Sequence, residues 1–247
     1  MKAIAIMLTI AAVGTLLVRE YIQNGTRRWF TSSLPNPESI SQWTNDELDQ
    51  RLYKLSRWDD FSPAQFQRFV EHQIKGLRLN EKDKFHFLEV GVGVGAFTRH
   101  ILHKFPKSSG MGIDLESEVV AIAATILPSA RMELHVSDML KIPVDANEFD
   151  YVFVPGSLCY LHSLDDVKAA LTEFSRVLKP GGGLCASMLA SATSDMGSCN
   201  IRISKSMWML EGLHDYGMVM VSMEEMNDWG LPHALGRYST CMRKGLY

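Results

Sequence analysis

Glycine occupies every second position in a short segment that follows an apolar run. Residues 87–90 read Phe-Leu-Glu-Val. The glycines that follow are Gly91, Gly93 and Gly95, and an apolar helical pattern begins at Ala96. Glycine adopts positive φ angles and lets a ligand approach the backbone closely. This order predicts a strand, a ligand-binding bend and a helix, although the spacing also satisfies a dinucleotide-binding fingerprint.

Acidic residues follow the next two apolar runs. Asp114 ends the second run, where a carboxylate can accept hydrogen bonds from both ribose hydroxyls of an adenosine group. The same carboxylate could instead complement the dipole of the helix that follows it. Asp138, next to Met139, follows the third run, where an Asp side chain can meet an adenine amino group. These positions favour an adenosine-containing ligand without deciding which one.

Two further segments help to decide which adenosine-containing ligand the chain binds. Residues 149–154 read Phe-Asp-Tyr-Val-Phe-Val, and residues 178–183 read Leu-Lys-Pro-Gly-Gly-Gly. In this order and spacing, the motifs together resemble the class I S-adenosylmethionine-dependent methyltransferases, especially the small-molecule group called type 11. The resemblance covers residues 64–190 well and the remainder loosely, and it makes a nicotinamide-dependent oxidoreductase the least favoured alternative.

The resemblance implies a cofactor, S-adenosyl-L-methionine, and residues that hold it. Glu89 and the three glycines would hold the methionine moiety, Asp114 the ribose, and Asp138 with Met139 the adenine. Pro155, after the fourth strand, is a further cofactor-side candidate. The resemblance also implies a seven-stranded sheet in which strand 7 is antiparallel.

The acceptor should lie near the carboxyl ends of the strands. Many relatives carry histidines near position 160, whereas this chain has Tyr160, with His162 two residues later. His162 is a candidate general base or a helix cap, and Tyr160 could pack on the cofactor or touch the acceptor. His233 is a second candidate base or an exposed loop residue. The chain lacks the Asn/Asp-Pro-Pro-aromatic motif, which disfavours nucleic-acid bases and glutamine amides as acceptors.

Apolar strands alternate with helical patterns from residue 84 onward, which is typical of a parallel sheet covered on both faces. We therefore expect an α/β, Rossmann-like, doubly wound fold. The predicted strands are residues 85–90, 110–114, 132–136, 151–154, 183–189, 218–222 and 237–243. The predicted helices between them are 96–105, 118–127, 165–178 and 204–214.

Two capping-box patterns precede this core. Thr44 with Glu47, and Ser62 with Gln65, predict helices that begin at these positions and reach about residues 56 and 77. The helices could form a lid over the substrate. Residues 26–43 are rich in Ser, Pro, Asn and Thr, which predicts a linker.

The segment from Ala3 to Val18 carries no charge. At about 1.5 Å per residue it approaches the lower limit for a membrane-spanning helix. A convincing signal-peptide cleavage site is missing, so we favour an uncleaved hydrophobic anchor in residues 1–25. Basic residues after the span favour a cytosolic catalytic domain by the positive-inside rule. The predicted organisation is this anchor, a linker with the first lid helix over 26–61, and a methyltransferase domain over 62–247.

The composition of the chain bears on its ligands and partners. A net charge of −3 and dispersed basic residues give no footprint for nucleic acid. The four cysteines show neither a CxxC pair nor a zinc-ligand spacing, so we expect no metal and free thiols in a reducing compartment. Methionine-rich stretches in the C-terminal part favour an apolar small molecule as the acceptor. A protein methyltransferase and a cofactor-binding scaffold without catalysis stay open as alternatives.

Overall fold

The computed structural model describes residues 34–55, 62–189, 218–225 and 237–245. Residues Asn36–Tyr247 form a compact unit that contains the sheet and the helices discussed below. Among the helices in the described part of the chain, none is both long and apolar enough to cross a bilayer. The predicted anchor in residues 1–25, the predicted helix at 204–214 and His233 lie outside the described residues.

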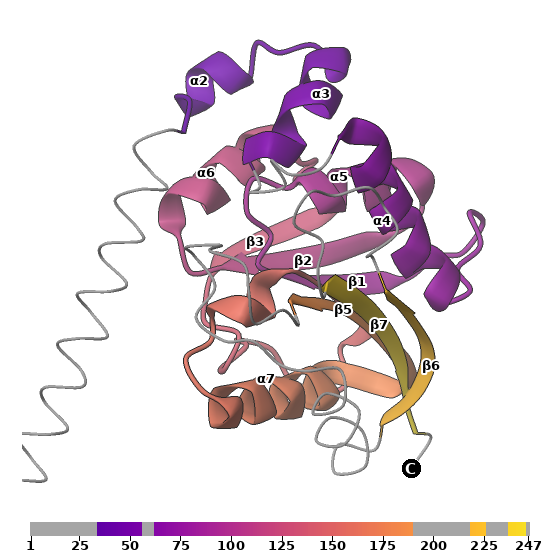
Figure 1. Cartoon of the computed structure of the whole chain (residues 1–247). Coiled ribbons are helices and arrows are strands. Elements are labelled where there is room, and N and C mark those ends of the chain that lie inside the picture. Colours follow the sequence, from indigo (N-terminus) through magenta and orange to yellow (C-terminus); the bar gives the residue numbers. More distant parts are fainter. Residues whose placement is uncertain (1–33, 56–61, 190–217, 226–236, 246–247) are drawn as a thin grey trace, which may run out of the picture. The chain divides into compact units, whose positions relative to one another are not determined.

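The centre of the fold is one sheet with strand order β3-β2-β1-β4-β5-β7-β6 (Figure 1). Strands β1 to β5 pair in parallel, β7 runs antiparallel to β5, and β6 pairs antiparallel with β7. The α/β Rossmann-like fold predicted from the sequence is confirmed. The strands are β1 (His86–Val90), β2 (Ser109–Asp114), β3 (Met132–Val136), β4 (Phe149–Pro155), β5 (Leu178–Leu189), β6 (Met218–Glu225) and β7 (Arg237–Lys244).

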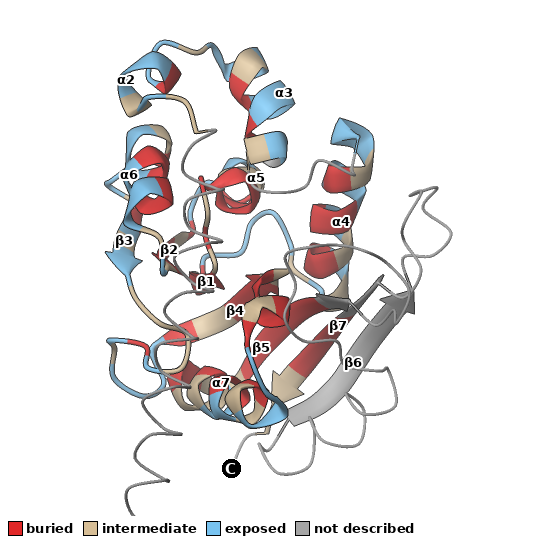
Figure 2. Ribbon diagram, turned by 60° about the vertical axis from the view of Figure 1, so that its left-hand side comes forward, coloured by how far each residue is buried: buried red, intermediate tan, exposed pale blue. Residues whose placement is uncertain are grey.

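Helices cover both faces of the sheet, as a doubly wound arrangement requires. Helices α4 (Pro63–Gly76), α5 (Ala96–Lys104) and α6 (Ser117–Ile126) lie on one face, and α7 (Leu164–Val177) lies on the other (Figures 1 and 2). The apolar stripe of α7 packs on β1, β2, β4 and β5. On the opposite face, Phe97 of α5 contacts Phe153 of β4, with ring centroids 5.2 Å apart. Burial on both faces explains why β1 and β4 are nearly continuous apolar runs.

Both predicted capping boxes are confirmed, and each begins a helix close to the predicted position. In α3 (Asn45–Leu55), Thr44 Oγ1 accepts from the Glu47 amide, and the Glu47 carboxylate accepts from the Thr44 amide at 2.9 Å. The Ser62 and Gln65 side chains make the same reciprocal pair at the start of α4. These bonds satisfy amides that a helix start leaves without partners.

The predicted linker over residues 26–43 is partly wrong. Residues 37–40 form a short helix, α2 (Pro37–Ile40), in which the Asn36 side chain accepts from the Glu38 amide. Proline at the first helical position, preceded by an Asn cap, favours a helical turn. Ile40 is buried, and burial of this side chain stabilises a turn that is too short to persist alone.

An ion pair on α7 holds the connection between β3 and β4. Arg176 donates to the carbonyl oxygens of Val144 (2.7 Å) and Ile142 (3.0 Å), and its partner Glu173 accepts from the Ile142 amide. The hydrogen bond from Arg176 lowers the pKa of Glu173. This network holds the connection that contains Asp138 and Met139, two of the predicted cofactor-binding residues.

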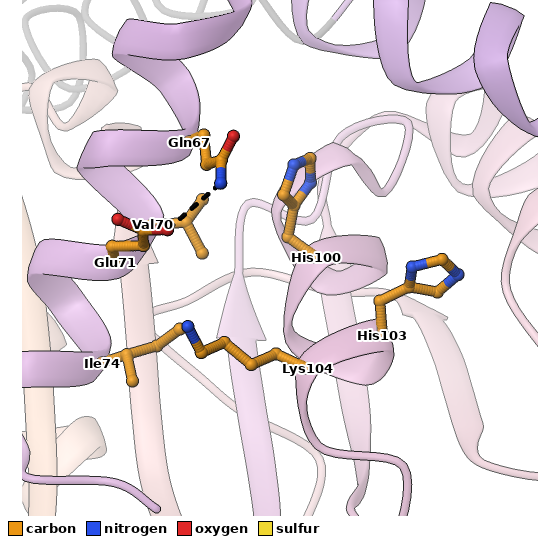
Figure 3. Close-up of a pocket in the computed structure, with 7 residues that line it drawn as sticks. All are labelled: Gln67, Val70, Glu71, Ile74, His100, His103 and Lys104. Carbon is orange, nitrogen blue, oxygen red and sulfur yellow. Dashed lines mark hydrogen bonds between the residues drawn. The ribbon is translucent and has the colours of Figure 1, made fainter. Parts of the chain in front are cut away.

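A groove of about 280 Å³ lies between α4 and α5 (Figure 3). Polar side chains from both helices line it, and within α4 the Gln67 side chain donates to the Glu71 carboxylate at 3.1 Å. None of the predicted site residues contributes to this groove. Its lining residues are Gln67, Val70, Glu71, Ile74, His100, His103 and Lys104.

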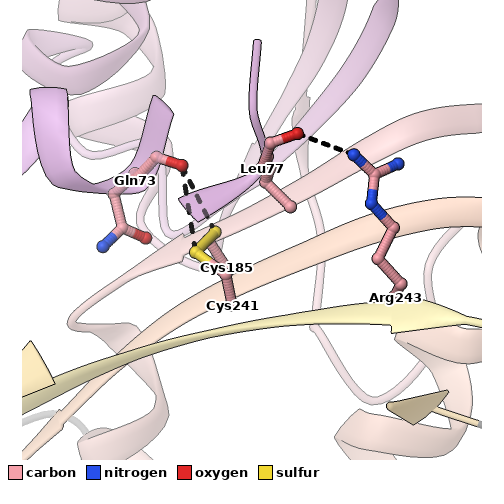
Figure 4. Close-up of a disulfide and its surroundings, with 5 residues drawn as sticks. All are labelled: Gln73, Leu77, Cys185, Cys241 and Arg243. Carbon is pink, nitrogen blue, oxygen red and sulfur yellow. Dashed lines mark hydrogen bonds between the residues drawn. A yellow bond between two sulfur atoms is a disulfide. The ribbon is translucent and has the colours of Figure 1, made fainter. Parts of the chain in front are cut away.

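The expectation of free thiols is wrong for the cysteines that the structure describes. Cys185 of β5 and Cys241 of β7 face each other in register and form a disulfide, and no free cysteine occurs among the described residues (Figure 4). Both sulfurs lie against the carbonyl oxygen of Gln73 in α4, at 3.6 and 3.8 Å. The two positions are 56 residues apart, and only strand pairing brings them together.

The disulfide should stabilise the fold by restricting the unfolded chain. For a closed loop of this length, the entropic contribution is up to about 4 kcal/mol. We therefore expect the Cys185→Ala variant to lose a large part of this free energy of unfolding, as measured by urea denaturation without reductant. Because either substitution removes the bond, Cys185→Ala/Cys241→Ala should cost little more than the single change. A single variant as stable as the wild type would contradict this assignment.

Candidate functional site

The candidate site lies where the chain order of the sheet reverses. Strands β1 and β4 are neighbours, and the segments that leave their carboxyl ends move toward opposite halves of the sheet. Ligands of open α/β sheets bind in the crevice outside such a switch point. The glycine bend follows β1 here, and the short helix η1 (Ser157–Tyr160) follows β4, which ends at Pro155.

The glycine bend has the backbone geometry that its sequence predicts. Gly91, Gly93 and Gly95 have φ angles of 76°, 52° and 87°, a region that side-chain-bearing residues rarely adopt. The amides of Gly91 and Val92 both donate to the carbonyl oxygen of Ile113, at 2.8 and 2.9 Å. The bend is therefore bonded directly to the end of β2.

Ser157 joins the bend to the β4 side of the site. Its hydroxyl donates to the carbonyl oxygen of Val90 at 2.8 Å, and the side chain is buried. A Cβ atom at Gly91 would lie 2.5 Å from the Ser157 Cβ atom. Position 91 therefore needs glycine for its backbone conformation and for its distance from η1. Nothing in the sequence pattern singled out Ser157.

Asp114 ends β2 and lies half-buried beside the glycine bend. One carboxylate oxygen accepts from the Gly93 amide at 2.9 Å, and the other accepts from the Glu116 amide at 3.1 Å. These two bonds fix the orientation of the carboxylate beside the glycine bend.

Next to Asp114, two large apolar side chains are exposed. Leu115 is 43% exposed and Val136 is 56% exposed. Val136 pairs directly with Asp114 in the parallel register between β2 and β3. Neither residue stands out in the sequence, because an apolar side chain at a strand end cannot be told from a core residue until its exposure is known. They give the site an apolar edge suited to a flat aromatic ring.

Asp138 and Met139 follow β3 on the same side of the sheet. The Asp138 carboxylate accepts from the Leu140 amide at 2.9 Å, which turns the chain after the strand. Met139 is partly buried against the core that α7 covers. Their position beside Val136 is compatible with contacts to an adenine, which stay a prediction.

Glu89 is the most deeply buried acid of the site, with only 1% exposure. Its carboxylate accepts hydrogen bonds from the hydroxyl and the amide of Thr98 in the first turn of α5. Burial raises the pKa of Glu89 to about 8, and the Thr98 bonds oppose this rise. The resemblance implies a site role for Glu89, whereas no pattern in the sequence singles out its partner Thr98.

The predicted acceptor-side residues are only partly assembled in the described structure. Pro155 is the last residue of β4 and Tyr160 is half-buried at the end of η1. The His162 side chain is exposed, and its amide donates to the Asp166 carboxylate at 3.3 Å at the start of α7. This geometry fits the capping alternative for the His162 backbone. The catalytic roles of Tyr160, His162 and His233 stay predictions.

The comparisons with known proteins agree with this geometry. The family model described as "Methyltransferase domain" matches residues 87–182, a range that begins in β1, contains the glycine bend, Asp114 and Asp138, and ends in the Gly-Gly-Gly turn of β5. Residues 87–182 thus match a methyltransferase domain.

Curated relatives of the methyltransferase domain carry related names. The chain is 31% identical over 97 residues to the demethylmenaquinone methyltransferase of Chlamydia caviae, covering 39% of this chain and 41% of the relative. It is 24% identical over 167 residues to the malonyl-[acyl-carrier protein] O-methyltransferase of Priestia megaterium, covering 66% and 59%. The chain thus spans about half the length of these two relatives.

A solved structure shares the fold around the methyltransferase domain. The [4+2]-cyclase SpnF aligns with a TM-score of 0.59 and 21% identity, over 73% of this chain and 82% of that one. This similarity concerns the fold alone, because one fold can host several chemistries.

The bend itself can be tested by substitution. Gly91→Ala should destabilise the protein by at least 1–2 kcal/mol, roughly the cost of a left-handed conformation with a Cβ atom, with the overlap on Ser157 adding to it. Urea denaturation of the variant would measure this loss. Gly76→Ala, at the end of α4, is a matched control that should gain up to about 1 kcal/mol. Equal effects at the two glycines would contradict the geometry assigned to position 91.

Proposed function

We propose that this chain binds S-adenosyl-L-methionine at the glycine bend and transfers its methyl group to a small-molecule acceptor. The observation that carries the proposal is the bond between the Gly93 amide and Asp114 at the switch point of a methyltransferase domain. This bond holds a carboxylate at the end of β2, beside backbone that can approach a ligand closely.

The residues around the bend suit the charge and the ring of the cofactor. Asp114 would bind the ribose hydroxyls. Leu115 and Val136 would lie against the adenine ring, and Asp138 would accept a hydrogen bond from the adenine amino group. Glu89 and the glycines would surround the methionine part, with Met139 and Pro155 as further cofactor contacts. Acidic side chains suit a ligand that carries a sulfonium and an ammonium group.

S-adenosylmethionine supplies a methyl group that its sulfonium already activates. The chain's residues therefore have to hold the acceptor in line with that group and to exclude water. Orientation alone can lower such a barrier by roughly 7–11 kcal/mol. An acceptor that must lose a proton also needs a base, and we propose Tyr160, His162 and His233 as the candidates.

We propose an apolar small molecule as the acceptor. One curated relative is named for demethylmenaquinone, which supports a small-molecule acceptor, whereas the other is named for a malonyl group on an acyl-carrier protein. The methionine-rich C-terminal sequence supports an adaptable apolar surface. A protein acceptor is a weaker alternative.

A second candidate function is binding of the cofactor without methyl transfer. The name of SpnF, a [4+2]-cyclase with a similar fold, is the observation that keeps this candidate open. Incubation of the purified chain with methyl-labelled cofactor and a lipid extract distinguishes the two. We expect a labelled small molecule, whereas cofactor binding without any labelled product would favour the second candidate.

We also propose that residues 1–25 anchor the chain in a membrane with the methyltransferase domain on the cytosolic side. The uncharged run from Ala3 to Val18, followed by Arg19, Arg27 and Arg28, supports this arrangement. The disulfide between Cys185 and Cys241 opposes this orientation, because disulfides are rare in the reducing cytosol, so the proposed sidedness depends on the basic residues alone.

The ribose contact predicts a specific loss of affinity. Asp114→Ala should weaken S-adenosylmethionine binding by 10-fold or more, because each hydrogen bond to a charged group contributes roughly 1.5–3 kcal/mol. Isothermal titration calorimetry measures this change. Glu118→Ala removes an exposed carboxylate from the first turn of α6 and should leave the affinity unchanged. Wild-type affinity in the Asp114 variant would refute the ribose role.

The anchor predicts how the chain partitions. Synthesised with microsomes, the full chain should stay in the membrane pellet after alkaline extraction, whereas a chain that begins at residue 26 should be released. Added protease should digest the domain of the full chain. Release of the full chain would refute the anchor, and protection of the domain would refute the cytosolic orientation.

A further inference from the structure

Helix α5 begins without a cap of its own. Its N-cap residue is Gly95, which has no side chain and makes no side-chain capping bond. The first amides of a helix need acceptors, and a buried helix start without them is costly. Residues Ala96 to Thr98 are all buried, so water does not replace a cap at this end of α5.

The missing cap comes from the neighbouring strand. Thr98 is the third residue of α5, and both its amide and its hydroxyl donate to the carboxylate of Glu89 in β1. Glu89 thus takes the position that a capping Asp or Ser usually occupies. Thr98 is 0% exposed and Glu89 is 1% exposed, so the pair is dry.

The surroundings of Glu89 disfavour its charge. Its register neighbours in the sheet, Gly112 of β2 and Phe153 of β4, are uncharged. Asp114, at the end of β2, acts on it as a like charge. The pKa of Glu89 is raised to about 8, chiefly by burial, so the protonated form predominates at pH 7 in the free protein.

We propose that Thr98 is a positioning residue that acts through Glu89, and that binding of S-adenosylmethionine releases a proton from the Glu89–Thr98 pair to solvent. This inference rests on the proposed function. The cofactor brings positive charge beside the glycine bend and stabilises the carboxylate form. Thr98 donates to that carboxylate and orients it, so the acid can ionise without leaving its place at the start of α5.

The sign of the pH dependence follows from this linkage. Below the pKa of Glu89 in the free protein, binding has to remove a proton, so the affinity rises with pH. Above that pKa the carboxylate already exists and the affinity reaches a plateau. Loss of the Thr98 hydroxyl removes a bond that favours the carboxylate, so the plateau should begin at a higher pH.

The experiment is a calorimetric titration of the wild type, Thr98→Val and Thr98→Ser between pH 6 and pH 9. We expect Thr98→Val to bind roughly tenfold more weakly at pH 7 and to approach the wild type at high pH, with its plateau displaced by about one pH unit. Thr98→Ser keeps the hydroxyl and should restore the wild-type profile. A merely structural role of Thr98 would instead give a loss of the same size at every pH, which would overturn the proposal.

Proton counting keeps the proposal falsifiable if Thr98→Val does not fold. Titrations of wild type and Glu89→Gln in buffers of different ionisation enthalpy give the number of protons released on binding, and the cofactor's own ammonium contributes equally to both. We expect the wild type to release more protons at pH 7, and equal release would overturn the proposal. If the wild type binds no S-adenosylmethionine at any pH, the proposed function fails instead.

Discussion

A buried strand that turns directly into a helix leaves several backbone amides at the bend without partners, and the site depends on how these amides are satisfied. In this chain the carbonyl of Ile113 accepts two of them, the carboxylate of Asp114 accepts the Gly93 amide, and the carboxylate of Glu89 accepts at the start of α5. The two acids that would meet a ligand are therefore also the groups that hold the backbone in place. This arrangement fixes the bend before any ligand arrives, which reduces the ordering cost of binding.

The bend is also tied to the two segments that face it. Ser157 connects β1 to the segment after β4 through the carbonyl of Val90, and the ion pair of Arg176 with Glu173 holds the loop after β3 against α7. Asp114, Asp138 and Pro155 lie at or just beyond the ends of three different strands, and the parallel register places all of them at one edge of the sheet. The side chains that surround the proposed cofactor site thus take their positions from sheet geometry and from a few buried polar contacts.

Local sequence signals predicted the parts of this structure that depend on local physics. Capping boxes at Thr44 and Ser62 predicted where two helices begin, and alternating apolar runs predicted the strands to within a few residues. Alternating glycines predicted the bend with its positive φ angles. Features that depend on long-range pairing were missed or wrong. The register of β5 with β7 joins Cys185 to Cys241, and no spacing in the sequence reveals that pairing.

In the candidate site, too, some residues could be predicted from local sequence signals and others could not. Asp114 could be selected because it ends an apolar run, and Glu89 because the resemblance assigns it to the methionine moiety. Thr98, Leu115 and Val136 carry no such signal, because their roles depend on which atoms surround them in space. The exposure of those two apolar side chains emerges only when β2 and β3 end together at the sheet edge.

The most direct measurement is a pair of calorimetric titrations of the folded chain, one with S-adenosylmethionine and one with a nicotinamide dinucleotide. Both ligands contain the adenosine group that Asp114 could hold, so the comparison separates the two kinds of glycine-rich site. Saturable heat with S-adenosylmethionine and none with the dinucleotide is the result that we predict. Binding of the dinucleotide alone would contradict the assignment of this bend to methyl transfer.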